Sequence, residues 1–183
     1  MIGPDPVHQD KRTPLLVRPL SYRSAADVLA ASDAFGSSWR ESDHPGVAWV
    51  VASRNEPWQV PWLDMGCRGI VRVGMEMPGG KQIEVFAGSA DTWNRPMVAD
   101  FVLELLSAWA QIKRNVLTPL SGLTIKQLKV LNMSLHGLSP RECAIEMGVT
   151  ERTVNFHLAT IQDKLGTQNK LQSLSKAIWL GAI

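Results

Sequence analysis

The sequence is poor in the features that define several large classes of protein. It has only two cysteines, Cys67 and Cys143, and they lie far apart. That spacing excludes a disulfide framework and a CxxC type of metal site. The longest apolar stretch, residues 98–110, is interrupted by Asp100 and Glu104. It is well short of the roughly 20 apolar residues that a membrane-spanning helix needs, so we expect no membrane partner.

Residues suited to catalysis do not cluster either. Asp64 has no histidine near it in the sequence. The histidines show no spacing typical of metal ligands; they are His8, His44, His136 and His157. The first eleven residues carry prolines and charges instead of the apolar core of a secretory signal. We therefore expect a cytoplasmic protein that is not an enzyme and has no metal site.

What the chain does have is the composition of a folded protein with an uneven charge. Its 183 residues are 45% hydrophobic and 20% charged, which is ordinary for a globular chain of one or two domains. The net charge is only +2, but residues 118–183 hold seven lysines and arginines against four acidic residues. A basic C-terminal segment on a near-neutral remainder suits a polyanionic partner.

The first two thirds of the sequence predict a small α/β domain, residues 1–117. The first 20 residues are rich in proline and read as an irregular or extended arm. A helix is expected over residues 22–35, a strand over 47–52 and a helix over 96–114, with Pro96 in its first turn. Residues 69–77 and 82–87 are β-prone runs joined by a Pro-Gly-Gly turn, which predicts a hairpin.

After an expected linker at residues 118–122, the chain reads as four helices. Thr124 with Gln127, and Ser139 with Glu142, have the spacing of capping boxes. Thr150 and Asn169 are suited to cap two further helices. Apolar residues follow each cap at helical spacing. The fold class is therefore α+β: an α/β domain followed by an all-α domain, residues 123–183.

The second and third of these helices are separated only by Gly148, Val149 and Thr150. So short a connection makes two helices cross steeply, which is the geometry of a helix-turn-helix. The third helix, residues 151–165, turns one apolar stripe inward: Val154, Leu158, Ile161 and Leu165. Its outer face then presents short or hydrogen-bonding side chains, suited to base edges in a major groove: Arg152, Asn155, Ala159 and Gln162.

Residues 123–183 also carry a specific resemblance. They are similar at family spacing to the LuxR-type (GerE-like) DNA-binding domain, over about a third of the chain. The matching residues are Leu123, Thr124, Val130, Leu131, Gly137, Ser139, Glu142, Ala144, Thr153, Val154, His157, Ile161, Lys164, Leu165, Asn169 and Ala177.

This resemblance implies a transcriptional regulator whose residues 151–165 form the recognition helix. Asn155 and Ala159 would face bases, and Thr153, His157 and Lys164 would serve the DNA backbone or the fold. From the residues alone, His157 reads equally well as a packed helix residue. The last helix would form part of a dimer contact, so we expect a homodimer on an inverted-repeat site in double-stranded DNA.

Three departures from the family pattern bear on DNA binding. Lys126-Gln127 stands where the family usually has Arg-Glu, and Asn169-Lys170 stands where it has Asn-Arg. Asn155 replaces the usual lysine or arginine. Because a cation is missing at this position, one phosphate or guanine contact is lost, which favours adenine as the base contacted.

The N-terminal half is similar, more distantly, to the acyl-homoserine-lactone-binding domain of quorum-sensing LuxR receptors. The similarity lies in Asp43, residues 47–54, Pro57-Trp58, the strand pair and the helix after Pro96. It implies that Asp43 accepts a ligand amide N–H and that Trp58 donates to a lactone carbonyl. The segment is shorter than in that family, so a smaller ligand or none are alternatives. Asp43 also reads as a turn or capping residue, and Trp58 as core.

Two other functions fit the same sequence. One is region 4 of an RNA-polymerase sigma factor, with RNA polymerase as partner; His157 and the last helix favour the LuxR type. The other is a shortened homologue that pairs with full-length LuxR-type receptors and silences them.

Overall fold

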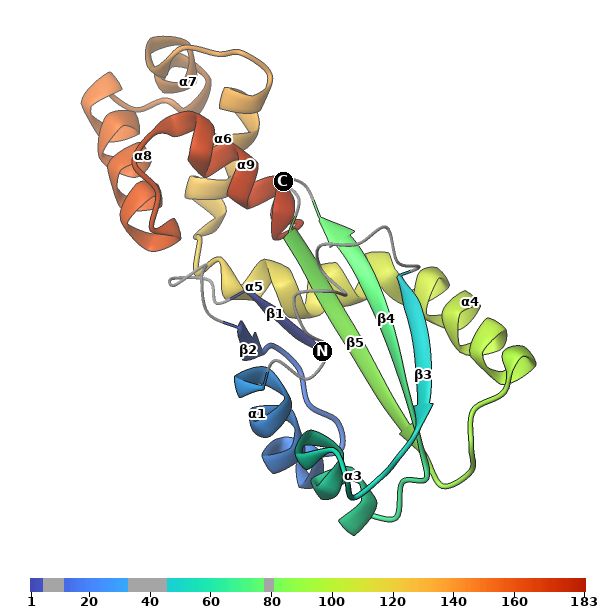
Figure 1. Ribbon diagram of the computed structural model, residues 1–183. Helices are drawn as coiled ribbons and strands as arrows, with labels where there is room; N and C mark the ends of the chain where they lie inside the picture. Colours follow the sequence, from blue (N-terminus) through green and yellow to red (C-terminus); the bar gives the residue numbers. More distant parts are fainter. Residues whose placement is uncertain (5–11, 33–45, 78–80) are drawn as a thin grey trace. The chain divides into compact units, whose positions relative to one another are not determined.

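The computed structural model describes residues 1–4, 12–32, 46–77 and 81–183. These form two compact units, Met1–Trp109 and Ala110–Ile183. The first combines a sheet with helices and the second is helical (Figure 1), which confirms the predicted fold class. Within the described ranges, no helix is both long and apolar enough to cross a membrane.

The N-terminal unit contains a five-stranded antiparallel sheet with strand order β2-β1-β5-β4-β3. Its strands are β1 (Ile2–Pro4), β2 (Arg12–Pro14), β3 (Val47–Val51), β4 (Gly69–Met77) and β5 (Lys81–Ser89). The predicted strand and hairpin are confirmed: β4 pairs with β5 from Gly69 opposite Ser89 to Met77 opposite Lys81.

The first 20 residues, expected to form an irregular or extended arm, include the two strands β1 and β2. Ile2 is almost fully buried and lies opposite Glu84 of β5, so this segment supplies an apolar side chain to the sheet. Both strands are short and end at a proline, Pro4 and Pro14. Proline has no backbone N–H and cannot donate to the ladder of a sheet. It is tolerated there because a strand end or edge does not need that hydrogen bond.

Helices cover both faces of the sheet. The 3₁₀ turn η1 (Leu20–Tyr22) leads into α1 (Arg23–Ala31), and η2 (Pro57–Gln59) leads into α3 (Val60–Asp64). These lie on one side, and α4 (Arg95–Ile112) lies on the other (Figure 1). The predicted helices are thus confirmed at α1 and α4, although residues 33–35 of the first lie outside the described residues. No helix was predicted over the residues of α3.

The core on the α1 side joins both helices to the sheet. Its buried residues are Ile2, Ala25, Leu29, Trp58, Trp62, Cys67 and Ile70. Gly88 of β5 allows α3 to approach, because a Cβ there would lie 2.6 Å from the Cys67 sulfur and 3.0 Å from the Trp62 ring. No other residue has a side chain small enough for that contact.

A buried ion cluster accompanies this core. Glu84 of β5 pairs with Arg12 of β2 and accepts a 2.6 Å hydrogen bond from Nε of Arg72 on β4. Arg72 and Glu84 are each nearly inaccessible to water. A buried charge of this kind is stable only when it is paired, so the three strands are held in register by these side chains as well as by the ladder.

The C-terminal unit starts earlier than the sequence suggested. The expected linker, residues 118–122, includes a helical turn, α5 (Thr118–Leu120), which follows the π-helical segment η3 (Lys113–Leu117). Leu117 is fully buried, and Oγ1 of Thr118 donates to the Gly181 carbonyl over 2.9 Å. These contacts attach residues 113–118 to the end of the chain, so the two units divide near Trp109 instead.

Four longer helices complete the unit: α6 (Ile125–Leu135), α7 (Pro140–Met147), α8 (Glu151–Leu165) and α9 (Lys170–Trp179). Each predicted cap is confirmed. Thr124 and Ser139 form full capping boxes, and the side chains of Thr150 and Asn169 accept from the backbone N–H groups of Thr153 and Gln172. The helix ends are therefore encoded locally, by side chains within three residues of each start.

Candidate nucleic-acid interface

The turn between α7 and α8 sets the geometry of the candidate site. Gly148 ends α7 in the left-handed conformation, with φ +64°, which suits glycine because it has no Cβ. The Val149 N–H donates to the Ala144 carbonyl over 3.0 Å, and Thr150 caps α8 at once. The chain therefore reverses in three residues, and the predicted helix-turn-helix is present.

The inner side of α8 anchors it in the unit. Val154, Ile161 and Leu165 are buried, and Leu158 is half-buried. They pack in a unit whose other helices contribute their own buried residues, among them Val130, Leu131, Cys143, Ala144 and Ala177. The orientation of α8 is thus fixed by an apolar stripe, which leaves its opposite side open.

The open side of α8 carries most of the side chains predicted to meet DNA. Arg152, Asn155 and Ala159 are exposed, whereas Gln162 is half-buried at the edge. Between them lies Phe156, with 68% of its surface exposed. We refer to Arg152, Asn155, Phe156 and Ala159 as the open face of α8.

Three other predicted residues hold the fold. Thr153 hydrogen-bonds its hydroxyl to that of Thr150 over 2.9 Å, within the cap. The Lys164 ammonium donates to the Gly122 carbonyl over 2.8 Å and to Oε1 of Gln127 over 3.0 Å. His157 is half-buried, and its ring lies 6.3 Å from that of Phe156. A role of these residues in DNA binding stays a prediction.

The basic side chains of residues 118–183 also fall into two groups, those that bond within the fold and those that are exposed. Besides Lys164, the ammonium groups of Lys170 and Lys176 donate to the carbonyls of Leu138 and Leu165, near helix ends. The other cations of residues 118–183 are exposed: Lys126, Lys129, Arg141 and Arg152. Within residues 118–183, these four side chains are the ones available to neutralise phosphates without breaking a bond of the fold.

The surroundings of two titratable groups near the turn shift their pKa values. Hydrogen bonds from the Ser139 backbone and hydroxyl lower the pKa of Glu142, so this carboxylate stays charged at the N-terminus of α7. Burial raises the pKa of the Cys143 thiol. Cys143 is fully buried in the unit and serves as a small core residue, as the sequence indicated.

Phe156 is the residue of the open face that the sequence prediction missed. The signal was available, because Phe156 follows Arg152 by four residues and precedes Ala159 by three. Residues at these spacings share one side of a helix. The pattern of buried residues therefore placed Phe156 outside, although an apolar side chain is usually assigned to a core.

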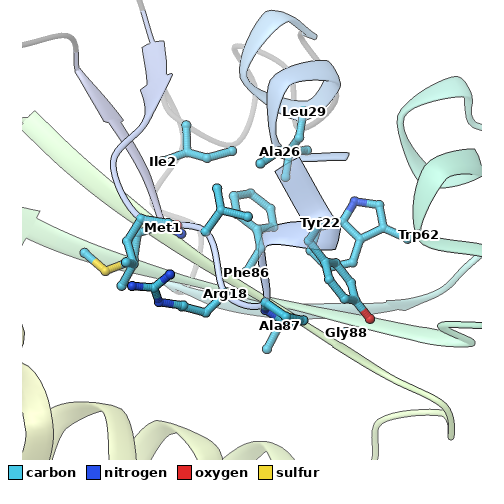
Figure 2. Close-up of a pocket in the computed structure, with 13 residues that line it drawn as sticks. Met1, Ile2, Arg18, Tyr22, Ala26, Leu29, Trp62, Phe86, Ala87 and Gly88 are labelled. Carbon is cyan, nitrogen blue, oxygen red and sulfur yellow. Dashed lines mark hydrogen bonds between the residues drawn. The ribbon is translucent and has the colours of Figure 1, made fainter. Parts of the chain in front are cut away.

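The N-terminal unit contains a cavity of about 210 Å³ between α1, α3, β5 and the residues before α1. Figure 2 shows Tyr22 and Trp62 next to each other on one side of it, with Arg18 on the other. The indole N–H of Trp62 is buried and has no hydrogen-bond partner among the described residues. The Tyr22 hydroxyl lies 3.0 Å from the Cys67 sulfur, and this bond raises the pKa of Tyr22 to about 12.

Only one of the two residues predicted to bind a ligand lies in the described part of the chain. Trp58 is buried in the N-terminal core and is not among the lining residues. Asp43 lies outside the described residues. The prediction that these two side chains hold a ligand is therefore open. Among the described residues, Trp62 is the tryptophan that lines the cavity.

Comparison with known proteins identifies the C-terminal domain. The family model described as "Bacterial regulatory proteins, luxR family" matches residues 121–177. The transcriptional activator protein LuxR of Aliivibrio fischeri is 44% identical over 63 residues, which are 34% of this chain and 25% of LuxR. The predicted resemblance to the LuxR type is confirmed for this domain.

In another relative, the likeness extends beyond that domain. The transcriptional activator protein SolR of Ralstonia nicotianae is 30% identical over 155 residues, covering 75% of this chain and 63% of SolR. That alignment is longer than the C-terminal unit, so it reaches into the N-terminal one. A crystal structure of Escherichia coli SdiA covers 90% of this chain and 73% of its own, at 21% identity and a TM-score of 0.40. The matched part of this chain covers 25% of LuxR and 63% of SolR, so it spans less than two thirds of the length of either activator.

Proposed function

Since residues 121–177 form a LuxR-family helix-turn-helix domain, we propose that this protein is a transcriptional regulator that binds specific sequences in double-stranded DNA. It is not an enzyme. Its partner is double-stranded DNA, and we expect it to act in the cytoplasm. The relatives that match this domain include proteins named as transcriptional activators, which supports regulation as the role.

One observation carries the proposal: the open face of α8 lies opposite its buried stripe and is rich in groups that suit a groove of DNA. Asn155 has the amide that bonds the N6 and N7 edge of adenine, and Arg152 bonds guanine or phosphate. Both side chains are exposed, so both are available to a partner. The helix follows the first helix of the motif after three residues, as a recognition helix does.

The test begins with selection of a site by the full-length protein from duplexes with random sequence. Affinity for the selected site and for a shuffled duplex is then measured by fluorescence anisotropy against salt concentration. We expect the selected duplex to bind more tightly, and log K to fall with log salt. The four exposed cations of residues 118–183 should contribute a slope of up to about −4 per subunit, since each phosphate contributes about −0.9. Equal affinity for both duplexes would contradict the proposal.

We also propose that two copies bind an inverted repeat. Leu171 and Ile178 support this, because both are exposed on α9 and lie seven residues apart, on one side of the helix. Leu103 and Leu106 of α4 are exposed as well. Exposed apolar side chains gathered on a helix face are typical of a surface that pairs with another protein. A dimer places two α8 helices about one helical turn of DNA apart.

A small ligand is the third part of the proposal. The cavity beside Trp62 is smaller than the roughly 300–1,000 Å³ of most ligand pockets, which favours a compact molecule that offers a hydrogen-bond acceptor to the indole N–H. A short acyl-homoserine lactone meets that description. Native mass spectrometry of protein from its own host should detect the ligand. Trp62→Phe should lose it and Trp49→Phe, at an exposed position, should keep it.

A further inference from the structure

We infer that the ring of Phe156 contacts thymine methyl groups in the major groove, and so helps to determine which sequence this protein binds. The inference rests on the proposed function, and it concerns a residue of the open face to which the resemblance assigned no role. It starts from the exposure of Phe156, which leaves 68% of a large apolar surface in water.

The fold does not account for this side chain. Val154, Ile161 and Leu165 fill the core beneath α8, and Phe156 points away from them by its position in the helix. The ring contact described for it is with His157, its neighbour in sequence, at 6.3 Å. Its backbone carbonyl accepts a hydrogen bond from the Thr160 hydroxyl over 2.9 Å, which does not involve the ring. The aromatic ring therefore leaves apolar surface in water, which is unfavourable, and adds nothing to the core of the unit.

The neighbours of Phe156 indicate what covers it. Asn155 is adjacent and suits the edge of adenine, while an A·T pair also presents the thymine C5-methyl group in the major groove. Ala159, one turn onward and exposed, has only a methyl group and leaves space beside the ring. Asn155 and Phe156 together thus offer an amide for adenine and an apolar surface for thymine, on one or on adjacent A·T pairs.

The major groove is the groove that this geometry fits. Apolar side chains that are inserted between base steps act from the minor groove, whereas the second helix of a helix-turn-helix enters the major groove. The ring therefore lies against base edges and does not unstack them. A second protein is the other partner that could cover an exposed aromatic ring, and the experiment below distinguishes it.

The test uses uracil, which differs from thymine only by lacking the methyl group. Full-length protein first selects a site from duplexes with about 20 random base pairs, enough for two half-sites one turn apart. Each thymine of the selected site is then replaced singly by deoxyuridine. For the native protein we expect one position in each half-site to lose about fourfold in affinity, the value of burying one methyl-sized group.

Two substitutions and a control decide the outcome. The affinity of Phe156→Ala should not change when uracil replaces thymine at that position. The affinity of Phe156→Leu, which keeps an apolar side chain, should still fall. Ile125→Ala removes another exposed apolar group, on α6, and should behave as the native protein does. Circular dichroism checks that each variant is folded.

Several results would overturn the inference. If no uracil replacement weakens the native protein, or if Phe156→Ala stays as sensitive as the native protein, Phe156 does not contact a thymine methyl group and a protein partner covers the ring instead; specific DNA binding would still stand. If the native protein selects no site at all, the proposed function fails, and the inference fails with it.

Discussion

At the scale of single residues, the fold separates basic side chains that look alike in the sequence. Lys164 and Arg152 both lie on α8 and both are exposed. Lys164 bonds the Gly122 carbonyl and the Gln127 amide, so it connects α8 to the start of α6. Arg152 lies on the open face. The first is expected to contribute to stability and the second to binding.

Replacing Lys164 by Met should therefore destabilise the protein without changing its response to salt. Loss of two charge-assisted hydrogen bonds at an exposed site costs about 1 kcal/mol, which lowers the melting temperature by roughly 2–4 °C for a chain of this size. Arg152→Ala should leave the melting temperature unchanged and make the salt slope shallower by about 1. The reverse pattern would mean that Lys164 is the phosphate contact.

Glu84 offers a second residue-scale prediction. Glu84→Gln keeps the shape of the side chain but leaves the buried Arg72 without a carboxylate. Breaking a buried pair from one side costs about 3 kcal/mol in free energy of unfolding. Asp64→Asn breaks the exposed pair with Arg54 and should cost less than about 1 kcal/mol. Urea denaturation compares the two, and equal losses would refute the structural role of the buried cluster.

At the scale of elements, the helix starts in the C-terminal unit depend on single capping side chains. Thr150→Ala removes the oxygen that accepts from the Thr153 N–H at the start of α8. We expect a loss of about 1 kcal/mol in free energy of unfolding, typical of an N-cap. Thr92→Ala, at an exposed position outside the helices, is the matched control. A change of equal size in both variants would show that the cap does not stabilise α8.

The elements that could be predicted from the sequence are those with local signals. The bounds of α8 follow from the Thr150 cap and the glycine at 166, and the β4–β5 hairpin follows from its turn. Strands β1 and β2 could not be predicted, because their pairing with β5 is long-range and proline obscures it. In the sequence alone, Arg72 and Glu84 look like surface residues because they are charged. Only the pairing of β4 with β5 places them in the interior.

The site could be predicted in outline for the same reason. Arg152, Asn155 and Ala159 follow from the period of α8, and they lie where expected. The bonds that Lys164 makes depend on how α8 packs near α6, which no local pattern reveals. The cavity beside Trp62 likewise forms only when residues before α1 meet β5.

At the scale of the whole molecule, dimerisation is expected to control affinity for an inverted repeat. Leu171→Glu with Ile178→Glu places charges on the exposed apolar side of α9. We expect a monomer by light scattering, with weaker binding to the full repeat and unchanged affinity for an isolated half-site. Ile145→Glu, on α7 and equally exposed, is the control and should remain dimeric. A dimer that persists in the double variant would place the contact elsewhere.

The most direct measurement is the affinity of the full-length protein for its selected duplex, compared with that of Asn155→Ala. The account predicts that Asn155→Ala remains folded, binds the selected duplex about tenfold or more weakly, and loses discrimination at one A·T pair of each half-site, because a good side-chain contact to a base is worth about 1–3 kcal/mol. If Asn155→Ala binds and discriminates as the native protein does, the open face of α8 does not read DNA, and the central claim is wrong.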